Sequence, residues 1–187
     1  MTDDRALISG VTGGDEKAVR QLIQQHQRLV AHMIARVVKR QEDLEELCQD
    51  VFMTVITKLP GFAFQSKLST WIATIAYRHA INHLRKQKPV MEDWKDDEVW
   101  AERFVETQNP EEILSDKDLD EWTMKLIDQL PVQYKTVVTL YHLEGMTYNE
   151  ISAVTEMPEG TVKNYLFRAR NLLKEKVKQY LPKEERV

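Results

Sequence analysis

The segment from residue 147 to 173, TYNEISAVTEMPEGTVKNYLFRARNLL, constrains the fold more than any other part of the chain. Thr147 and Glu150 have the spacing of a capping box, in which each side chain bonds the backbone amide of the other residue at a helix start. Pro158 disfavours helical geometry in the residue before it, so a first helix ends there, and residues 158–160 provide a turn and a second helix start. We therefore predict two short helices joined by a tight turn.

The second of these helices combines one apolar stripe with a cationic face. Its apolar positions recur at spacings of four, three and four residues, as on one side of an α-helix. Such a helix can read the major groove of duplex DNA, and we favour this helix-turn-helix interpretation over an ordinary solvated basic face. The stripe is Val162, Leu166, Ala169 and Leu173, and the other face carries Lys163, Asn164, Phe167, Arg168, Arg170 and Lys174.

Charge is distributed unevenly along the chain. The 187 residues carry a net charge of −4, which alone argues against a nucleic-acid partner. Residues 91–121 hold thirteen Asp and Glu against three Lys and Arg, a net of −10, so the rest of the chain carries +6. Residues 60–90 hold five Lys and Arg and no acid, and residues 161–183 hold seven against one Glu. Two basic blocks separated by an acidic one favour a nucleic-acid-binding protein.

The composition favours an all-α protein, and a chain of 187 residues fits one or two domains. Gly and Pro number six each, and helical periodicities dominate. The single cysteine, Cys48, excludes an internal disulfide framework and fits a reducing compartment. No apolar run approaches the ~20 residues that span a bilayer, and the N-terminus lacks a signal-peptide core, so we expect a cytoplasmic protein without membrane insertion. We predict a first domain over residues 1–90, an acidic linker over 91–117 and a second domain over 118–187.

Apolar periodicity predicts the helices of the first domain. We expect residues 1–14 to be irregular, and a helix from residue 16 to about 40 that is broken near residues 24–27. Acidic residues 42–46 favour a new helix start through the helix dipole, and Pro60 ends this helix. Its first half has an acidic outer face, which is either simply solvated or, as we favour, a docking surface for a basic partner. The polar residues of this face are Glu42, Glu45, Glu46, Gln49 and Asp50.

Residues 60–90 place aromatic side chains beside cations. An irregular segment from Phe62 to Lys67 precedes a predicted helix over residues 69–86, whose apolar side includes Trp71. Unpaired bases can stack on aromatic rings while cations follow the phosphates, so the block fits single-stranded nucleic acid and a pocket for an unstacked base. The alternative is that Phe62 and Trp71 belong to the hydrophobic core.

His79 and His83 have a spacing that can bind zinc, but the glutamate of an H-E-x-x-H motif is missing and no third ligand follows. We therefore predict no metal and a basic, DNA-facing surface that is protonated part of the time. Cys48 lies among acids that disfavour its thiolate, and no catalytic triad or phosphate-binding loop is present. The sequence predicts neither an enzyme nor a cofactor.

Taken together, the segments resemble extracytoplasmic-function (group 4, sigma-70 family) RNA polymerase sigma factors from about residue 8 to 180. DLEELCQDVF at residues 43–52 is similar to the family's region 2.2. KLSTWIATIA at residues 67–76 is similar to its regions 2.3 and 2.4, and residues 130–170 are similar to the region 4 helix-turn-helix. The resemblance implies a subunit that binds core RNA polymerase and promoter DNA, with an anti-sigma factor as a further partner.

The resemblance also implies roles for individual residues. Docking on the β′ clamp helices falls to Asp43, Glu46, Gln49, Asp50 and Phe52. Opening of the minus-ten element falls to Phe62, Phe64, Lys67, Trp71, Arg78, Asn82 and Arg85. Reading of the minus-35 element falls to Thr161, Lys163, Asn164, Phe167, Arg168 and Arg170, in a domain that also meets the β flap.

Three positions depart from the family pattern. Arg78 replaces an Asn that many members carry in the pocket for the captured base, and Asn82 replaces a common Asp, so the identity of that base stays open. Tyr165 stands where a basic residue is frequent, so the minus-35 sequence cannot be copied from relatives. The alternative function is a stand-alone helix-turn-helix regulator, whose N-terminal half would bind an effector or dimerise and which would bind duplex DNA tightly by itself.

Overall fold

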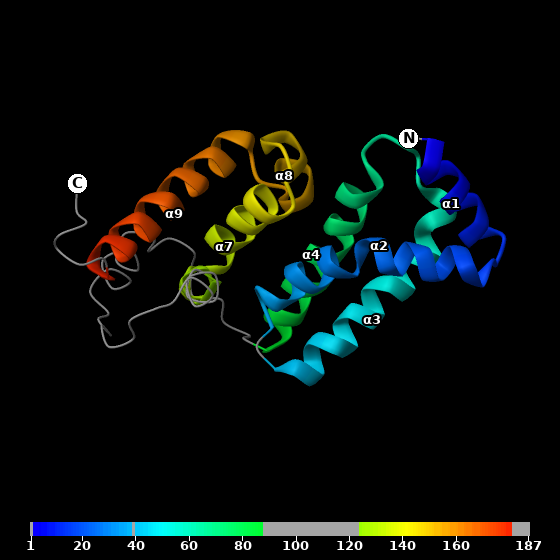
Figure 1. Cartoon of the computed structure of the whole chain (residues 1–187), viewed down its shortest axis with the longest axis horizontal. Helices are drawn as coiled ribbons and strands as arrows, with labels where there is room; N and C mark the ends of the chain where they lie inside the picture. Colours follow the sequence, from blue (N-terminus) through cyan, green and yellow to red (C-terminus); the bar gives the residue numbers. More distant parts are fainter. Residues whose placement is uncertain (1, 39, 88–123, 181–187) are drawn as a thin grey trace.

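The computed structural model describes residues 2–38, 40–87 and 124–180, and within these ranges the regular secondary structure is entirely helical (Figure 1). The N-terminal half contains α1 (Thr2–Thr12), α2 (Glu16–Ala35), α3 (Gln41–Lys58), the 3-10 helix η1 (Leu59–Gly61) and α4 (Leu68–Gln87). The C-terminal half contains helical residues 124–129, α7 (Val132–Val138), the π-helix η2 (Thr139–Leu143), α8 (Tyr148–Thr155) and α9 (Glu159–Tyr180). The predicted all-α class is confirmed.

Three predictions for the first helices are wrong. The expected irregular entry over residues 1–14 is helix α1, because three apolar side chains on one of its faces are buried against the N-terminal half. Helix α2 is unbroken, since Leu22 and Leu29 keep the buried stripe continuous across residues 24–27, of which only His26 is half-buried and the three glutamines are exposed. It ends at Ala35, before the predicted end near residue 40. The buried residues of α1 are Leu7, Ile8 and Val11.

The N-terminal half is a bundle in which α2 packs against α1, α3 and α4 (Figure 1). Burial of one apolar stripe from each helix holds the bundle together, at roughly 1.5–3 kcal/mol for each fully buried large aliphatic side chain. Local signals set the helix ends: the Asp15 carboxylate accepts a hydrogen bond from the amide of Lys17 at 2.9 Å and caps α2. Side chains with no exposed surface include Val30, Ile34, Val51, Val55 and Ile72.

The predicted helix-turn-helix is present as α8 and α9. The Thr147 hydroxyl accepts from the amide of Glu150, and the Glu150 carboxylate accepts from the amide of Thr147 at 2.9 Å, so the capping box is complete. Helix α8 ends at Thr155, with Glu156 in the left-handed conformation (φ 62°) just before the predicted end. The apolar stripe of α9 is buried at its first three positions and half-buried at Leu173, as its spacing predicts.

The two halves pack against one another through α4 and α8 (Figure 1). Their buried side chains form one continuous hydrophobic cluster. Among the described residues, the ion pairs Lys67–Glu150 (2.8 Å), Arg78–Glu156 (2.6 Å) and Arg36–Asp128 cross the junction, and the Nδ1 atom of His32 lies 2.7 Å from a Glu144 carboxylate oxygen. The predicted acidic linker and the predicted domain boundaries near residues 90 and 118 lie outside the described residues.

Candidate polymerase and nucleic-acid interfaces

The acidic face of α3 borders a cavity shared with α4. The cavity has a volume of about 430 Å³, and α3 contributes Asp43, Glu46 and Asp50 to its lining. Helix α4 contributes Asn82 and Lys86. Residues that the sequence assigns to polymerase binding and to the minus-ten element therefore lie side by side. Sequence reasoning places each group on its own helix but has no signal for this proximity, which arises from the packing of α3 against α4.

His79 and His83 also line this cavity, so they face α3 and are only partly open to solvent. The Nε2 atom of His79 lies 3.1 Å from the Thr54 hydroxyl, and the Nε2 atom of His83 lies 4.0 Å from an Asp43 carboxylate oxygen. Burial lowers the pKa of His79, which favours its neutral form at neutral pH. The His79 ring thus lies against α3, and its burial disfavours the protonated form that the sequence predicts for part of the time. Within the described residues no group of three or more His, Cys, Asp and Glu is placed to hold a metal ion.

Phe52 is misassigned by the sequence. Its side chain is 9% exposed and packs in the hydrophobic core of the N-terminal half, so it supports α3 from below and does not reach a partner. The other predicted polymerase-binding residues are more open: Glu46, Gln49 and Asp50 are exposed, and Asp43 is half-buried. Phe52 shares the buried face of α3 with Val55, because residues three positions apart lie on the same side of an α-helix.

The aromatic residues before α4 form a series from the core to the surface. Trp71 is half-buried, its ring lies 5.2 Å from that of Phe62, and the Phe62 ring lies 4.9 Å from that of Phe64. Phe62 is 8% exposed, so the core interpretation holds for this residue. Phe64 is 39% exposed, which leaves part of its ring open to solvent. Phe64 is therefore the most exposed ring of the three.

The cations that the sequence assigns to the minus-ten element are exposed, and two of them form ion pairs with residues of the C-terminal half. Lys67 pairs with Glu150 at the start of α8, and Arg78 pairs with Glu156 at its end. Asn82 and Arg85 are exposed as well. Lys67 and Arg78 therefore neutralise carboxylates of α8 in this arrangement, and they must exchange those carboxylates for phosphates if they bind DNA.

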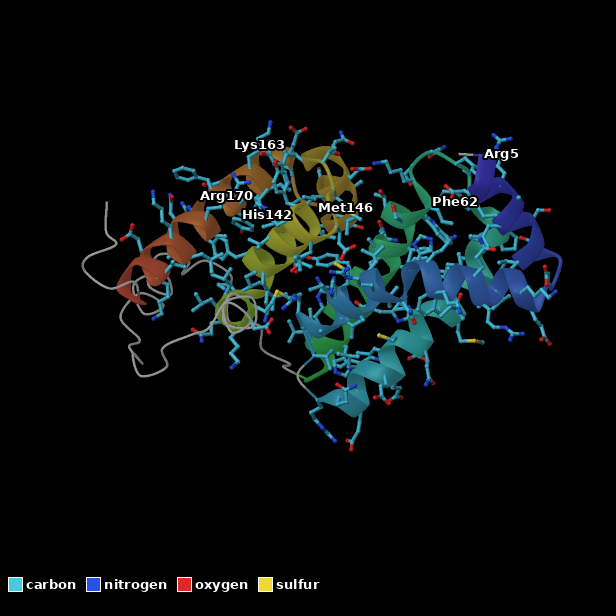
Figure 2. The ribbon with its side chains drawn as sticks, viewed as in Figure 1. Arg5, Phe62, His142, Met146, Lys163 and Arg170 are labelled. Carbon is cyan, nitrogen blue, oxygen red and sulfur yellow. The ribbon has the colours of Figure 1, made fainter. Side chains whose placement is uncertain are left out.

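On α9, the predicted reading residues lie on the outer side of the helix. Lys163, Asn164, Phe167 and Arg170 are exposed, with 64% exposure for Phe167, while Thr161 and Arg168 are half-buried. An exposed aromatic side chain between polar ones can contact the methyl group of thymine in a major groove. Figure 2 shows Lys163 and Arg170 at separate points along α9, so the predicted surface extends over several turns.

Two tyrosines join the cations of α9 to the preceding helices. The rings of Tyr141 and Tyr148 stack with centroids 5.2 Å apart. The Arg170 guanidinium lies 5.2 Å from the Tyr141 ring, and the Lys163 ammonium lies 5.4 Å from the Tyr148 ring. These contacts hold the two cations in place, because a cation is attracted to the face of an aromatic ring. Sequence reasoning misses both tyrosines, since the contacts connect three helices and leave no periodic signal.

Comparison with known proteins identifies the family. Residues 22–90 match the model for sigma-70 region 2, and residues 120–173 match the model for sigma-70, region 4. The ECF RNA polymerase sigma-E factor of Escherichia coli (strain K12) is 32% identical over 182 residues, which cover 93% of this chain and 94% of the relative. The chain belongs to the ECF RNA polymerase sigma factors. The sigma-E factor of Haemophilus influenzae is also 32% identical, over 93% of this chain and 95% of its own.

Solved structures share the fold of this ECF sigma factor. CnrH, in complex with the cytosolic domain of CnrY, has a TM-score of 0.65 and 18% identity, over 94% of this chain and 97% of CnrH. The sigma factor RpoE of Bartonella quintana, in complex with the anti-sigma factor NepR, has a TM-score of 0.62 and 21% identity, over 85% and 96% of the two chains. The resemblance to the family is confirmed, and the alternative of a stand-alone regulator is not. None of the described helices is long and apolar enough to cross a bilayer.

The ion pair between Lys67 and Glu150 joins the two halves, so its effect on the pKa of Glu150 tests whether they pack in this way. The Lys67 ammonium, and then the Thr147 amide, lower the pKa of Glu150 from its usual 4.5 to about 2. Because this pKa is lower in the folded protein, the stabilisation is complete above pH ~4.5 and is lost as the pH falls toward about 2. We predict that Lys67→Ala raises the pKa of Glu150, while the capping box keeps it below 4.5.

The carboxyl carbon shift of Glu150, followed by NMR during an acid titration, measures this pKa in the wild type and in Lys67→Ala. Lys58→Ala, which removes an exposed cation from the end of α3, serves as the control and should leave the titration unchanged. An identical Glu150 pKa in the wild type and Lys67→Ala would show that the two halves do not make this contact in solution.

Proposed function

We propose that this ECF sigma factor binds core RNA polymerase and directs initiation at specific promoters, with its C-terminal half on the minus-35 element and its N-terminal half opening the minus-ten element. The match to both sigma regions in one chain carries the proposal. Neither half is sufficient for promoter-specific initiation. A helix-turn-helix places a protein on duplex DNA, and a separate aromatic surface is needed to hold an unpaired base. The polymerase supplies the catalysis, so the chain needs no catalytic residues or cofactor and works in the cytoplasm.

The surface of α3 that carries Glu46, Gln49 and Asp50 is the proposed contact with the β′ clamp helices. Exposed carboxylates on one helix face attract a basic partner surface, and charges at the edge of an interface act mainly on the association rate. The cavity between α3 and α4 continues this acidic surface toward the minus-ten residues. Polymerase contact and strand capture would thus use neighbouring residues of one rigid bundle.

Strand capture is assigned to Phe64, Lys67, Arg78, Asn82 and Arg85, with Trp71 and the buried Phe62 behind them. Stacking of a base on an aromatic ring is worth about 1–3 kcal/mol, which offsets the few kcal/mol lost when the base leaves its duplex. The exposed cations would follow the phosphates of the opened strand. Since Lys67 and Arg78 pair with α8 in this arrangement, DNA must displace the carboxylates of Glu150 and Glu156.

Reading of the minus-35 element is assigned to the outer side of α9. Asn164 and Phe167 present an amide and an apolar ring to base edges, and Lys163, Arg168 and Arg170 supply positive charge beside them. The β flap is the proposed polymerase contact of the same half. The sigma factor of Bartonella quintana is bound to an anti-sigma factor, and we propose a partner of this class for the present chain as well.

Replacement of Gln49 and Asp50 by alanine is predicted to slow association with purified core polymerase. The loss of charge at the edge of the interface should reduce the rate about three- to tenfold at low salt and less at high salt. Surface plasmon resonance at two salt concentrations measures the effect. Glu16→Ala, which removes an exposed carboxylate from α2, is the matched control. Equal association of the double variant and the wild type would exclude this face as the docking surface.

Two single variants of α9 are predicted to affect promoter binding in different ways, one by a loss of sequence specificity and the other by a uniform loss of affinity. Asn164→Ala should cost about 1–3 kcal/mol at one position of the minus-35 element and relax specificity there. Lys174→Ala should weaken binding to every promoter variant alike and reduce the salt dependence by about one unit of slope. Titration of holoenzyme against a set of single-base promoter variants separates the two outcomes. A uniform loss for Asn164→Ala would reassign this residue to the DNA backbone.

A further inference from the structure

Arg5, on the exposed side of α1, contacts the loop that carries the proposed strand-capture ring. Its guanidinium carbon lies 5.0 Å from the centroid of the Phe64 ring. The other neighbour of Phe64 in the aromatic series is Phe62, whose ring centroid lies 4.9 Å away with the two planes tilted by 56°, so the Phe64 ring contacts both a cation and a buried ring. Figure 2 shows Arg5 and Phe62 at the same end of the N-terminal half. None of the residues that the sequence identifies on this surface comes from α1.

The backbone at Phe64 needs external support. Its φ of 55° lies in the left-handed region, where a side chain with a Cβ atom is disfavoured. The loop from Phe62 to Lys67 has no regular secondary structure, and Ala63, Gln65 and Ser66 are exposed. A strained backbone conformation persists only where surrounding contacts hold it. Phe62 and Arg5 both contact the Phe64 ring and can supply such support.

Helix α1 is well anchored, so it can hold Arg5 against the Phe64 ring. Leu7, Ile8 and Val11 fix it in the hydrophobic core, and it packs against η1, which leads directly into the loop. Arg5 is therefore held at a defined place relative to the loop, although its own side chain is exposed. A planar guanidinium on such a base can stack on an aromatic ring and restrict its orientation.

We infer that Arg5 is a positioning residue for promoter opening, which holds the Phe64 ring ready to stack on an unpaired base of the minus-ten element. The inference rests on the proposed function and adds α1 to the strand-capture surface. It differs from a direct role of Arg5 as a phosphate contact, because a positioning residue acts only while the Phe64 ring is present.

A double-mutant cycle in the reconstituted holoenzyme tests the inference. Permanganate reactivity of unpaired thymines measures opening of a promoter fragment, under conditions in which the wild type opens about half of the molecules. Arg5→Ala should reduce the equilibrium constant for opening about two- to fivefold, the range expected for an exposed cation–π contact. Arg5→Lys should retain most of the opening, because an ammonium also binds the ring face. Arg20→Ala, which removes an exposed cation from α2, should behave as the wild type.

The Phe64→Ala background separates positioning from DNA contact. If Arg5 acts through the ring, Arg5→Ala should have no further effect on opening in a Phe64→Ala holoenzyme, while binding to core polymerase stays the same throughout. An equal reduction in both backgrounds would assign Arg5 to DNA and overturn the inference. So would normal opening by Arg5→Ala, or a loss of core binding that accounts for its defect. A wild-type holoenzyme that opens no promoter would instead refute the proposed function, and the inference with it.

Discussion

Glu150 is the residue on which the arrangement of this sigma factor depends. Its carboxylate completes the capping box that starts α8, and it also pairs with Lys67 of the N-terminal half. One side chain thus fixes the start of the helix-turn-helix and joins it to the loop at residues 62–67, which we propose captures the opened strand and which we call the strand-capture loop. The low pKa of Glu150 has both causes, with Lys67 the larger. Lys67 and Arg78 pair with carboxylates of the C-terminal half and are also proposed to bind DNA, so DNA binding would compete with the packing of the two halves.

Local sequence signals were sufficient for most of the helices. The capping box at Thr147, the cap at Asp15 and the breaks at Pro60 and Pro158 act within a few residues, so they can be recognised without the tertiary structure. The failures have tertiary causes. The polar residues 24–27 of α2 resemble a break in the sequence, but Leu22 and Leu29 on either side of them keep the buried stripe continuous. Helix α1 is stabilised by its contacts with the bundle.

For the candidate sites, the sequence predicts the kind of residue better than its exposure. Periodicity separates the outer carboxylates of α3 from its core but does not exclude Phe52, and only packing shows that Phe62 lies beneath Phe64. The sequence does not predict contacts between distant segments. Examples are the contact of Arg5 with Phe64, the Tyr141–Tyr148 stack, and the cavity that α3 and α4 share. Each depends on helices that meet only after folding, so no spacing rule within one segment predicts it.

Run-off transcription with purified core polymerase tests most directly whether the two halves act together. A genomic fragment that supports initiation would be compared with versions in which either the minus-35 or the minus-ten element is scrambled. The paired roles of α9 and the strand-capture loop predict transcripts only when the chain is added, and their loss when either element is scrambled. Failure to initiate from any genomic fragment, or initiation that ignores both elements, would contradict these roles.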